Sequence, residues 1–287
     1  MGEAKRAAIA ELIGFDGRLE IADIGAAMLG PTAVYQELLD LGLGRLNAFD
    51  ADVRQHAALQ AAHGEGLNLY DAIIGDGGPA TLHLAAPESG MSSLLAPSQR
   101  HLSFFNNFEV IGRVLQTVPV QTTRLDDVPG LPDIDFLKMD IQGGELTALR
   151  HGPQRLARCV AIQLEVSFVP LYENQPTFGE IDVWMRGQGF LPHAVAELKR
   201  WSIAPILRDN DFRSPFNQLL EADVVYVRDP TAPEAMDDDL VRRLILVAHY
   251  VYYSLDLAGR LILVLQGRGA VPPDTLNRYL ALLGGAG

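Results

Sequence analysis

Three carboxylates in the first quarter of the chain follow short apolar runs and have the spacing to bind a nucleoside. Asp23 lies near the end of one run, Asp50 follows a second run 27 positions later, and Asp71 lies in a third. The two oxygens of a carboxylate can accept both hydrogen bonds of a ribose diol, the role given to the acid after the second strand of a dinucleotide site. An acid at the third strand can accept a hydrogen bond from the amino group of adenine. We therefore expect these three aspartates at a nucleoside site.

The residues after Asp23 indicate the kind of nucleoside. Gly25 lets the backbone approach a ligand closely, and the next glycine is Gly30. The middle glycine of G-x-G-x-x-G, the pattern that holds a pyrophosphate on a helix N-terminus, is missing. This disfavours a NAD-linked oxidoreductase and favours a nucleoside without phosphate. S-adenosylmethionine is such a ligand, and its sulfonium cation suits an acidic site.

Two acids later in the chain are candidates for accepting a proton. Asp140 and Glu165 each follow an apolar run, and a carboxylate beside an acceptor hydroxyl can act as general base. His101 is a third candidate because imidazole titrates near neutral pH, and it follows a loop of small and polar residues, 90–97, that is typical of a lid. Each has a structural alternative: backbone amides can hold either acid, and the histidine can be a surface residue without a role.

Other acids favour structural roles. Asp133 and Asp135 have D-x-D spacing, but they lie at the start of a predicted strand, at the opposite edge from the nucleoside site. Asp140 alone does not supply the several oxygens that a hard cation needs, so we expect no metal. Glu145 opens a predicted helix, where the helix dipole favours a carboxylate; direct contact with substrate is the alternative.

The elements that must position these residues alternate between strand and helix periodicity over the first 230 residues. This alternation predicts an α/β fold with a mostly parallel sheet covered on both faces, which binds ligands at the carboxyl ends of its strands. The predicted strands are 19–25, 45–50, 67–74, 80–85, 135–140, 160–166, 190–198 and 222–227, and the predicted helices are 32–41, 52–62, 145–150 and 178–186.

After residue 230 the pattern becomes entirely helical. We predict a domain over 1–230 and a helical extension over 231–287, with one long helix capped by 237–239 and running to about 266, and a second over 275–283. The apolar run 244–255 has only 12 residues, short of a membrane span, and indicates a buried helix. Aromatic residues in this helix offer a possible homodimer contact.

Composition excludes several classes of protein. The 287 residues carry a formal charge of −13, and no dense stretch of Lys or Arg is available to neutralise phosphates, so we expect no nucleic-acid partner. A single cysteine, Cys159, cannot form an internal disulfide. The N-terminal residues lack the apolar core of a signal peptide, and we expect a cytoplasmic protein.

Four blocks of sequence together resemble the FkbM-type SAM-dependent methyltransferases. They are 23–27, 125–127, 136–145 and 165–168, and the block around 137–145 is the most specific. The resemblance extends in order over about residues 20–200. It implies a class I methyltransferase (Rossmann-like) fold, with a seven-stranded sheet whose last strand is antiparallel. It also implies transfer of a methyl group from S-adenosylmethionine, most often to a hydroxyl oxygen of a small metabolite, sugar or glycan.

The resemblance also implies roles for particular residues, with two departures from the family pattern. Ala27 replaces the usual Asn, and Asp50 replaces the usual Glu, which shortens the reach to the ribose. A catalytically idle module that binds S-adenosylmethionine or another nucleoside and acts through its C-terminal helices is the alternative function. The implied cofactor residues are Asp23, Gly25, Ala26, Phe49, Asp50, Asp71, Ala72 and Asp140; Ser92, Ser93 and Phe104 are the candidates for contact with the acceptor.

Overall fold

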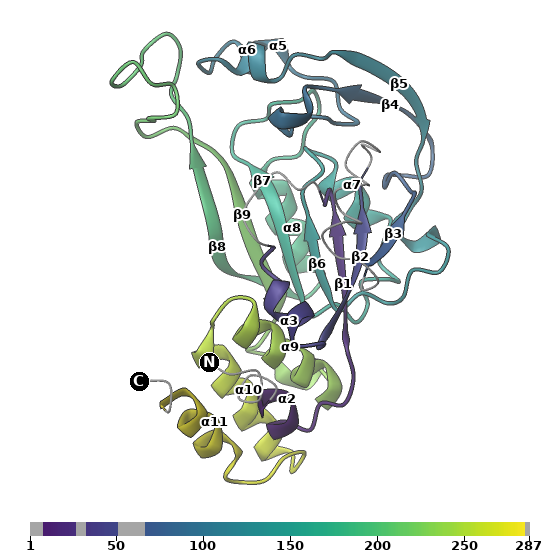
Figure 1. Ribbon diagram of the computed structural model, residues 1–287, viewed down its shortest axis with the longest axis vertical. Helices are drawn as coiled ribbons and strands as arrows, with labels where there is room; N and C mark the ends of the chain where they lie inside the picture. The colour runs from purple at the N-terminus through teal and green to yellow at the C-terminus, as the bar shows by residue number, and fades with distance from the viewer. Residues whose placement is uncertain (1–7, 27–32, 51–66, 285–287) are drawn as a thin grey trace.

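The centre of the molecule is a seven-stranded sheet (Figure 1). The computed structural model describes residues 8–26, 33–50 and 67–284. The strand order in the sheet is β3-β2-β1-β6-β7-β9-β8. These strands are β1 (Leu19–Ile24), β2 (Gly44–Phe49), β3 (Leu67–Tyr70), β6 (Phe136–Met139), β7 (Ala161–Ser167), β8 (Phe190–Arg200) and β9 (Leu219–Arg228).

Five neighbouring strands of this sheet run parallel. β1 pairs parallel with both β2 and β6, and β3 and β7 continue the parallel pairing outwards on either side. β9 runs antiparallel to both β7 and β8. The expected α/β fold, with a mostly parallel seven-stranded sheet and an antiparallel last strand, is therefore confirmed.

Successive residues of the central strands pack into two different hydrophobic clusters. Ile21 and Phe136 belong to a cluster with helices α2, α3, α9, α10 and α11, whereas Ala22 and Leu137 belong to a cluster with α7 and α8. Side chains alternate across a strand, so strands that are apolar at nearly every position need cover on both faces. These helices are α2 (Ala8–Leu12), α3 (Gln36–Asp40), α7 (Glu145–Arg150), α8 (Phe178–Gly187), α9 (Asp238–Tyr250), α10 (Leu255–Gly267) and α11 (Thr275–Gly284).

A small second sheet corrects one prediction. The predicted strand 80–85 exists as β4 (Pro79–Leu84), but it pairs antiparallel with β5 (Gln116–Gln121), outside the main sheet. The strand β5 was not predicted from the sequence, because its two valines flank Pro119, a residue that argues against a strand, and none of its side chains is fully buried. This pair lies beyond the carboxyl ends of the parallel strands, together with α5 (Gln99–Leu102) and α6 (Phe108–Ile111) (Figure 1).

The helical C-terminal region corrects a second prediction. The single helix expected up to about residue 266 is two helices, α9 and α10, because the chain breaks at 251–254, where Tyr253 has a φ of +52°. Asp237 caps α9 as predicted, since its carboxylate accepts a hydrogen bond from the Leu240 N–H at 2.8 Å. The buried helix predicted for the apolar run 244–255 is confirmed only up to Tyr250, where α9 ends, and Tyr253 beyond it is 68% exposed. Within the described ranges, no helix has the length and hydropathy to cross a membrane.

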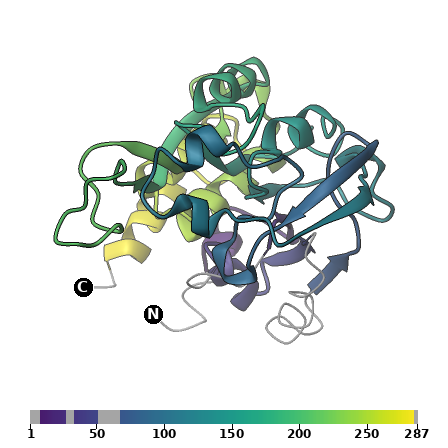
Figure 2. The same cartoon turned by 90° about the horizontal axis from the view of Figure 1, so that it is seen from above.

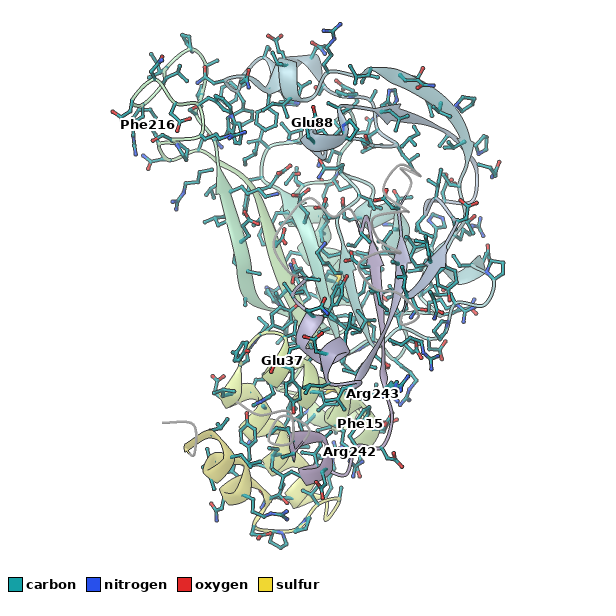
Figure 3. All side chains as sticks on the ribbon, in the orientation of Figure 1. Phe15, Glu37, Glu88, Phe216, Arg242 and Arg243 are labelled. Atoms are coloured by element: carbon teal, nitrogen blue, oxygen red, sulfur yellow. The ribbon has the colours of Figure 1, made fainter. Side chains whose placement is uncertain are left out.

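The helices α2, α9, α10 and α11 gather at the end of the sheet opposite β4 and β5 (Figure 1). Arg243 of α9 joins them to the sheet: its guanidinium lies 2.5 Å from the Asp135 carboxylate, just before β6, and 2.7 Å from Asp239. Figure 3 shows Arg243 near Phe15 at this junction, and the guanidinium lies 5.6 Å from the centroid of the Phe15 ring. The predicted division at residue 230 remains a prediction.

Some predicted features differ in extent or lie outside the described residues. The predicted helix 32–41 corresponds to the shorter α3, and the predicted strand 67–74 ends at Tyr70. The predicted helix 52–62, the substitution at Ala27 and Gly30 lie outside the described residues.

Candidate active site

The carboxyl ends of β1, β2 and β6 are tied together through their backbones. The N–H groups of Gly25 and Ala26 both donate to the Phe49 carbonyl, at 2.9 and 3.0 Å, and the Asp140 N–H donates to the Ile24 carbonyl at 2.9 Å. Gly25 has a φ of +85°, and a Cβ at this position would lie 1.8 Å from the Asp140 carbonyl oxygen. A glycine is therefore required here by the close approach of two strand ends.

Asp23 is buried at this edge and is bound to other side chains. Its carboxylate accepts a hydrogen bond from the Tyr35 hydroxyl at 2.6 Å and lies 3.5 Å from the Lys138 ammonium. Burial lowers the pKa of Lys138, but the nearby Asp23, Asp140 and Asp223 carboxylates outweigh it and raise this pKa above its usual value. Asp23 is thus neutralised by a lysine that faces several carboxylates.

The remaining residues expected to contact a nucleoside follow β2 and β3. Phe49 is 1% exposed, and its ring stacks on that of Tyr70 with centroids 4.8 Å apart, so its side chain packs in the core. Asp50 is half-buried, Asp71 is exposed and Ala72 is half-buried. The backbone N–H groups of residues 25 and 26 both donate within the fold. The carboxylates of Asp50 and Asp71 are groups of the type that accepts hydrogen bonds from ligand hydroxyl and amino groups.

On the other side of β1, the structure joins Asp140 and Glu165 through one glutamine. The side-chain amide of Gln142 donates to Asp140 at 2.8 Å and to Glu165 at 2.7 Å. The other oxygen of Glu165 lies 2.6 Å from the Lys199 ammonium, which also lies 3.7 Å from the Glu221 carboxylate. We call these five side chains the acid cluster. Glu165 and Glu221 are 5% and 6% exposed and so are shielded from water, whereas the other three members are half-buried.

Burial raises the pKa of two carboxylates in the acid cluster. The pKa of Glu165 is well above its usual value, because burial and the neighbouring Asp140 and Glu221 outweigh the opposing effect of Lys199. Burial raises the pKa of Glu221 to about 7. Lys199 stays a cation, since the two glutamates raise its pKa although burial lowers it. A carboxylate whose pKa is raised in this way holds a proton more tightly than an ordinary glutamate, a property typical of a general base.

Gln142 is held by contacts on every side. It has a φ of +56°, a left-handed conformation that is uncommon for a residue other than glycine. Its side-chain oxygen accepts a hydrogen bond from the Tyr172 hydroxyl at 2.8 Å, and its backbone carbonyl accepts one from the Ser93 hydroxyl at 2.7 Å. Tyr172 and Ser93 are themselves buried. The orientation of the amide that joins Asp140 to Glu165 is therefore fixed by the surrounding fold.

Three other predicted residues lie in the region between β4 and β5. The Ser92 hydroxyl accepts the Ala85 N–H at 3.2 Å, which gives it a role in the loop. His101 bonds through Nδ1 to the Ser98 hydroxyl at 3.1 Å, and among the described residues it makes no hydrogen bond or ion pair with the acid cluster. Phe104 is exposed, and its backbone carbonyl accepts the Ala204 N–H at 2.9 Å from the loop that joins β8 to β9.

The acids with an expected structural role have internal partners. Glu145 is fully buried and accepts the N–H groups of Ile141 and Gly143, at 2.9 and 3.2 Å. Asp135 lies at the amino edge of the sheet, as predicted, and pairs with Arg243. In the part of the chain that the structure describes, no group of three or more His, Cys, Asp or Glu side chains is arranged to hold a metal ion.

Three members of the acid cluster were not predicted from the sequence. Lys199 and Glu221 lie opposite each other in the pairing of β8 with β9, a register that becomes visible only when the two strands are aligned as a hairpin. A lone acid in the apolar run Leu219-Leu220-Glu221 was the available signal. Gln142 belongs to the block 136–145, but its role depends on a backbone conformation that residue types alone do not specify.

Comparisons with known proteins agree with this architecture. A sequence model of a family, described as the methyltransferase FkbM domain, matches residues 34–192. The chain is 30% identical over 142 residues to the 2-O-methyltransferase NoeI of Sinorhizobium fredii, a match covering 46% of this chain and 57% of that protein. The chain thus spans little more than half the length of this relative.

Two solved structures of methyltransferases are also similar to the chain. One is the precorrin-6y C5,15-methyltransferase of Geobacter metallireducens, with 14% identity, a TM-score of 0.38, and coverage of 77% of this chain and 86% of that one. The other is the methyltransferase domain of bacterial CtHen1-C, with 10% identity, a TM-score of 0.32, and coverage of 79% and 98%.

Proposed function

Because the chain belongs to the FkbM methyltransferase domain family, we propose that it transfers the methyl group of S-adenosylmethionine to a hydroxyl oxygen of a small metabolite, sugar or glycan. The similarity to a protein named as a 2-O-methyltransferase supports oxygen as the acceptor atom. The acid cluster is the observation that carries the proposal, because it supplies a buried carboxylate beside the edge of the sheet at which ligands of parallel sheets bind.

The nucleoside half of the site contains residues of suitable chemistry for this cofactor. In this proposal Asp50 accepts hydrogen bonds from the ribose hydroxyls and Asp71 with Ala72 meets the adenine edge. Asp23, Gly25 and Ala26 belong to the end of β1 beside them. Acidic side chains also suit a cation. When bound there, S-adenosylmethionine supplies a methyl carbon on a sulfonium, ready for displacement by an oxygen nucleophile.

Glu165 is the proposed general base. Its carboxylate would take the proton of the acceptor hydroxyl as the oxygen bonds to the methyl carbon and the carbon–sulfur bond breaks, leaving a neutral thioether, so the oxygen need not ionise beforehand. Lys199 favours the ionised form of Glu165, and Gln142 fixes its second oxygen relative to Asp140. Asp140, which accepts the other hydrogen bond of the Gln142 side-chain amide, is proposed to orient the acceptor. Positioning and proton removal are the two demands of an in-line methyl transfer.

The substitution Glu165→Gln tests this assignment. It keeps the shape of the side chain but removes the base, so we expect methyl transfer to a panel of hydroxylated acceptors to fall about 100-fold or more. The affinity for S-adenosylmethionine, measured by calorimetry, should change little. Glu197→Gln, an exposed change on the same sheet, is the matched control and should leave turnover unchanged.

The possible outcomes separate the alternatives. An equal loss of cofactor affinity and of turnover would make Glu165 a structural residue, and unchanged turnover would transfer the role of base to another group. Cofactor binding by the unmodified chain without turnover on any hydroxylated acceptor would instead favour the idle binding module.

A further inference from the structure

An apolar groove lies at the edge of the sheet where β7 and β8 end and β9 begins. Because β8 runs parallel to β7 and β9 runs antiparallel to both, these three chain segments meet at the same edge. The groove has a volume of about 560 Å³, within the range of small-molecule sites. Its apolar walls include Phe168, Trp201, Ile203, Ile206, Phe216 and Leu219.

Each wall of the groove continues from a strand that carries a member of the acid cluster. Phe168 follows Glu165 by three residues and lies just after β7, and Trp201 follows Lys199 by two residues and lies just after β8. Leu219 precedes Glu221 by two residues on β9. The Phe168 N–H also donates to the Leu220 carbonyl at 2.8 Å, which holds the floor of the groove to the start of β9. The groove thus begins two or three residues along the chain from three members of the acid cluster, although the cluster's own side chains are not among its lining residues.

The loop that forms the outer wall is held in place by one asparagine. The side-chain amide of Asn106 donates to the hydroxyl of Ser202 and to the carbonyls of Ile203 and Ile206, at 3.1, 3.2 and 2.8 Å. The Trp201 indole N–H in turn donates to the Asn106 carbonyl at 2.8 Å. Residues close to the predicted acceptor residue Phe104 therefore preform the groove, which reduces the entropy lost on binding.

The composition of the groove favours a hydrocarbon over a bare sugar. Ile203, Ile206 and Phe216 are 39%, 63% and 46% exposed, and Figure 3 shows Phe216 on the loop beyond the ends of β8 and β9. The polar lining residues are two amides, Asn217 and Gln218. Sugar hydroxyls buried against such a surface would lose hydrogen bonds to water without replacement, which is unfavourable.

The size of the groove favours a small molecule over a second copy of the chain. Nine residues line it, whereas a stable protein interface engages about 20–30 residues on each side. The loop of residues 201–218 projects from the sheet in both ribbon views, next to α5 and α6 (Figure 1 and Figure 2). A ligand seated there would reach from this loop towards Glu165.

We propose that this groove binds the hydrocarbon portion of an amphiphilic acceptor whose hydroxyl group faces Glu165. The placement of that hydroxyl rests on the proposed function. Burial of the hydrocarbon against Trp201, Ile206 and Phe216 supplies the affinity, and the hydroxyl end of the acceptor lies at the acid cluster. The chain therefore selects acceptors by their apolar portion.

A series of n-alkyl glucosides tests this inference. The chain has two tryptophans, so Trp184→Phe leaves Trp201 as the only indole, and its emission reports directly on the groove. Hexyl, heptyl and octyl glucosides are titrated below their micelle concentrations, with glucose as the reference. We expect a blue shift of the emission and an affinity that rises about fourfold for each added methylene group. Calorimetry on the unmodified chain measures the same affinities without the substitution.

Two matched variants test whether octyl glucoside binds in the groove. Ile206→Asn places an amide in the groove and should weaken octyl glucoside binding about tenfold or more, whereas Val183→Asn changes an equally exposed residue of α8 and should leave it unchanged. An affinity independent of chain length, or equal effects of the two variants, would overturn the inference. So would a rise in molecular mass showing that a second copy covers the groove.

The same samples are titrated with S-adenosylmethionine, so that failure of this inference is distinguishable from failure of the proposed function. If S-adenosylmethionine binds but the affinity for alkyl glucosides does not depend on their chain length, only the inference about the groove is overturned. Chain-length dependence without cofactor binding supports the hydrocarbon site and contradicts the proposed function.

Discussion

Glu165 has a different neighbour at each carboxylate oxygen. One oxygen faces the Lys199 ammonium at 2.6 Å, and the other accepts a hydrogen bond from the Gln142 amide at 2.7 Å. Burial favours the neutral acid, whereas the lysine favours the carboxylate, so the balance between the two sets the pH at which this group can accept a proton. Lys199 therefore acts through Glu165, as a positioning residue for the proposed base.

The substitution Lys199→Met tests this balance. Loss of the cation raises the pKa of Glu165 further, so a smaller fraction of the base is ionised at a given pH. We expect the rising limb of the rate profile to move to higher pH and turnover at pH 7 to fall on the order of tenfold. Arg200→Met, a change in the next and exposed residue of β8, is the control. A profile that keeps its position while turnover falls would show that Lys199 has another role.

At the scale of elements, the turn from β6 into α7 determines the geometry of the site. Gly25 packs on the Asp140 carbonyl, and Gln142 adopts its left-handed conformation between half-buried Asp140 and buried Glu165. The strand ends and the start of α7 at Glu145 were predictable, because apolar runs and a first-turn acid are local signals. The pairing of Lys199 with Glu221 was not, because it depends on strand register, and β5 was missed because it is largely exposed.

Glu145 makes the stability of this turn dependent on pH. Burial raises the pKa of Glu145 to about 7, above its value of about 4.5 in the unfolded chain. The folded state therefore binds the proton more tightly, and its contribution to stability is complete below pH 4.5 and is lost as the pH rises towards 7. We expect Glu145→Gln to be more resistant to urea than the unmodified chain at pH 8, with a smaller difference at pH 5.

Urea unfolding at the two pH values checks this prediction. The glutamine oxygen can still accept the Ile141 and Gly143 N–H groups, so the hydrogen bonds of the turn are retained. Glu88→Gln, an exposed acid, should follow the unmodified chain at both pH values. A constant difference between Glu145→Gln and the unmodified chain would contradict the assigned pKa.

At the scale of the whole molecule, opposite ends of one sheet have different roles. The carboxyl edge carries the acid cluster and the groove, while the helices near both chain ends cover the amino edge (Figure 1). One buried cluster runs from Ile9 through Ile21 and Leu244 to Tyr279, so these helices share a core with the sheet. The helical character of this region was predictable from apolar periodicity, but its break at Tyr253 was not, since none of the residues 251–254 is a glycine or proline.

Substitution of Arg243 tests how much its ion pair with Asp135 stabilises the packing of these helices on the amino edge of the sheet. Removal of the guanidinium leaves a buried carboxylate that retains a hydrogen bond from the Glu20 N–H, so we expect Arg243→Met to lower the free energy of unfolding by about 2–3 kcal/mol at pH 8. Burial raises the pKa of Asp135 to about 6. At pH 5 this carboxyl is largely neutral in the folded chain, and the cost should be smaller.

Denaturant unfolding of this variant at both pH values, with the exposed change Arg260→Met as control, measures the difference. If Arg243→Met lowers the free energy of unfolding equally at pH 5 and pH 8, the charge of Asp135 does not contribute as predicted. Since the helices share a buried cluster with β1 and β6, we also expect a single cooperative transition.

The most direct test of the proposed function is a calorimetric titration of the ligand-free chain with S-adenosylmethionine and S-adenosylhomocysteine, repeated for Asp50→Ala. We expect micromolar binding of both compounds by the unmodified chain. We also expect a loss of about 10-fold to 150-fold in the variant, the range for a hydrogen bond to a charged group. Absence of binding to the unmodified chain would contradict the central claim, and an unchanged affinity in Asp50→Ala would remove this carboxylate from the ribose.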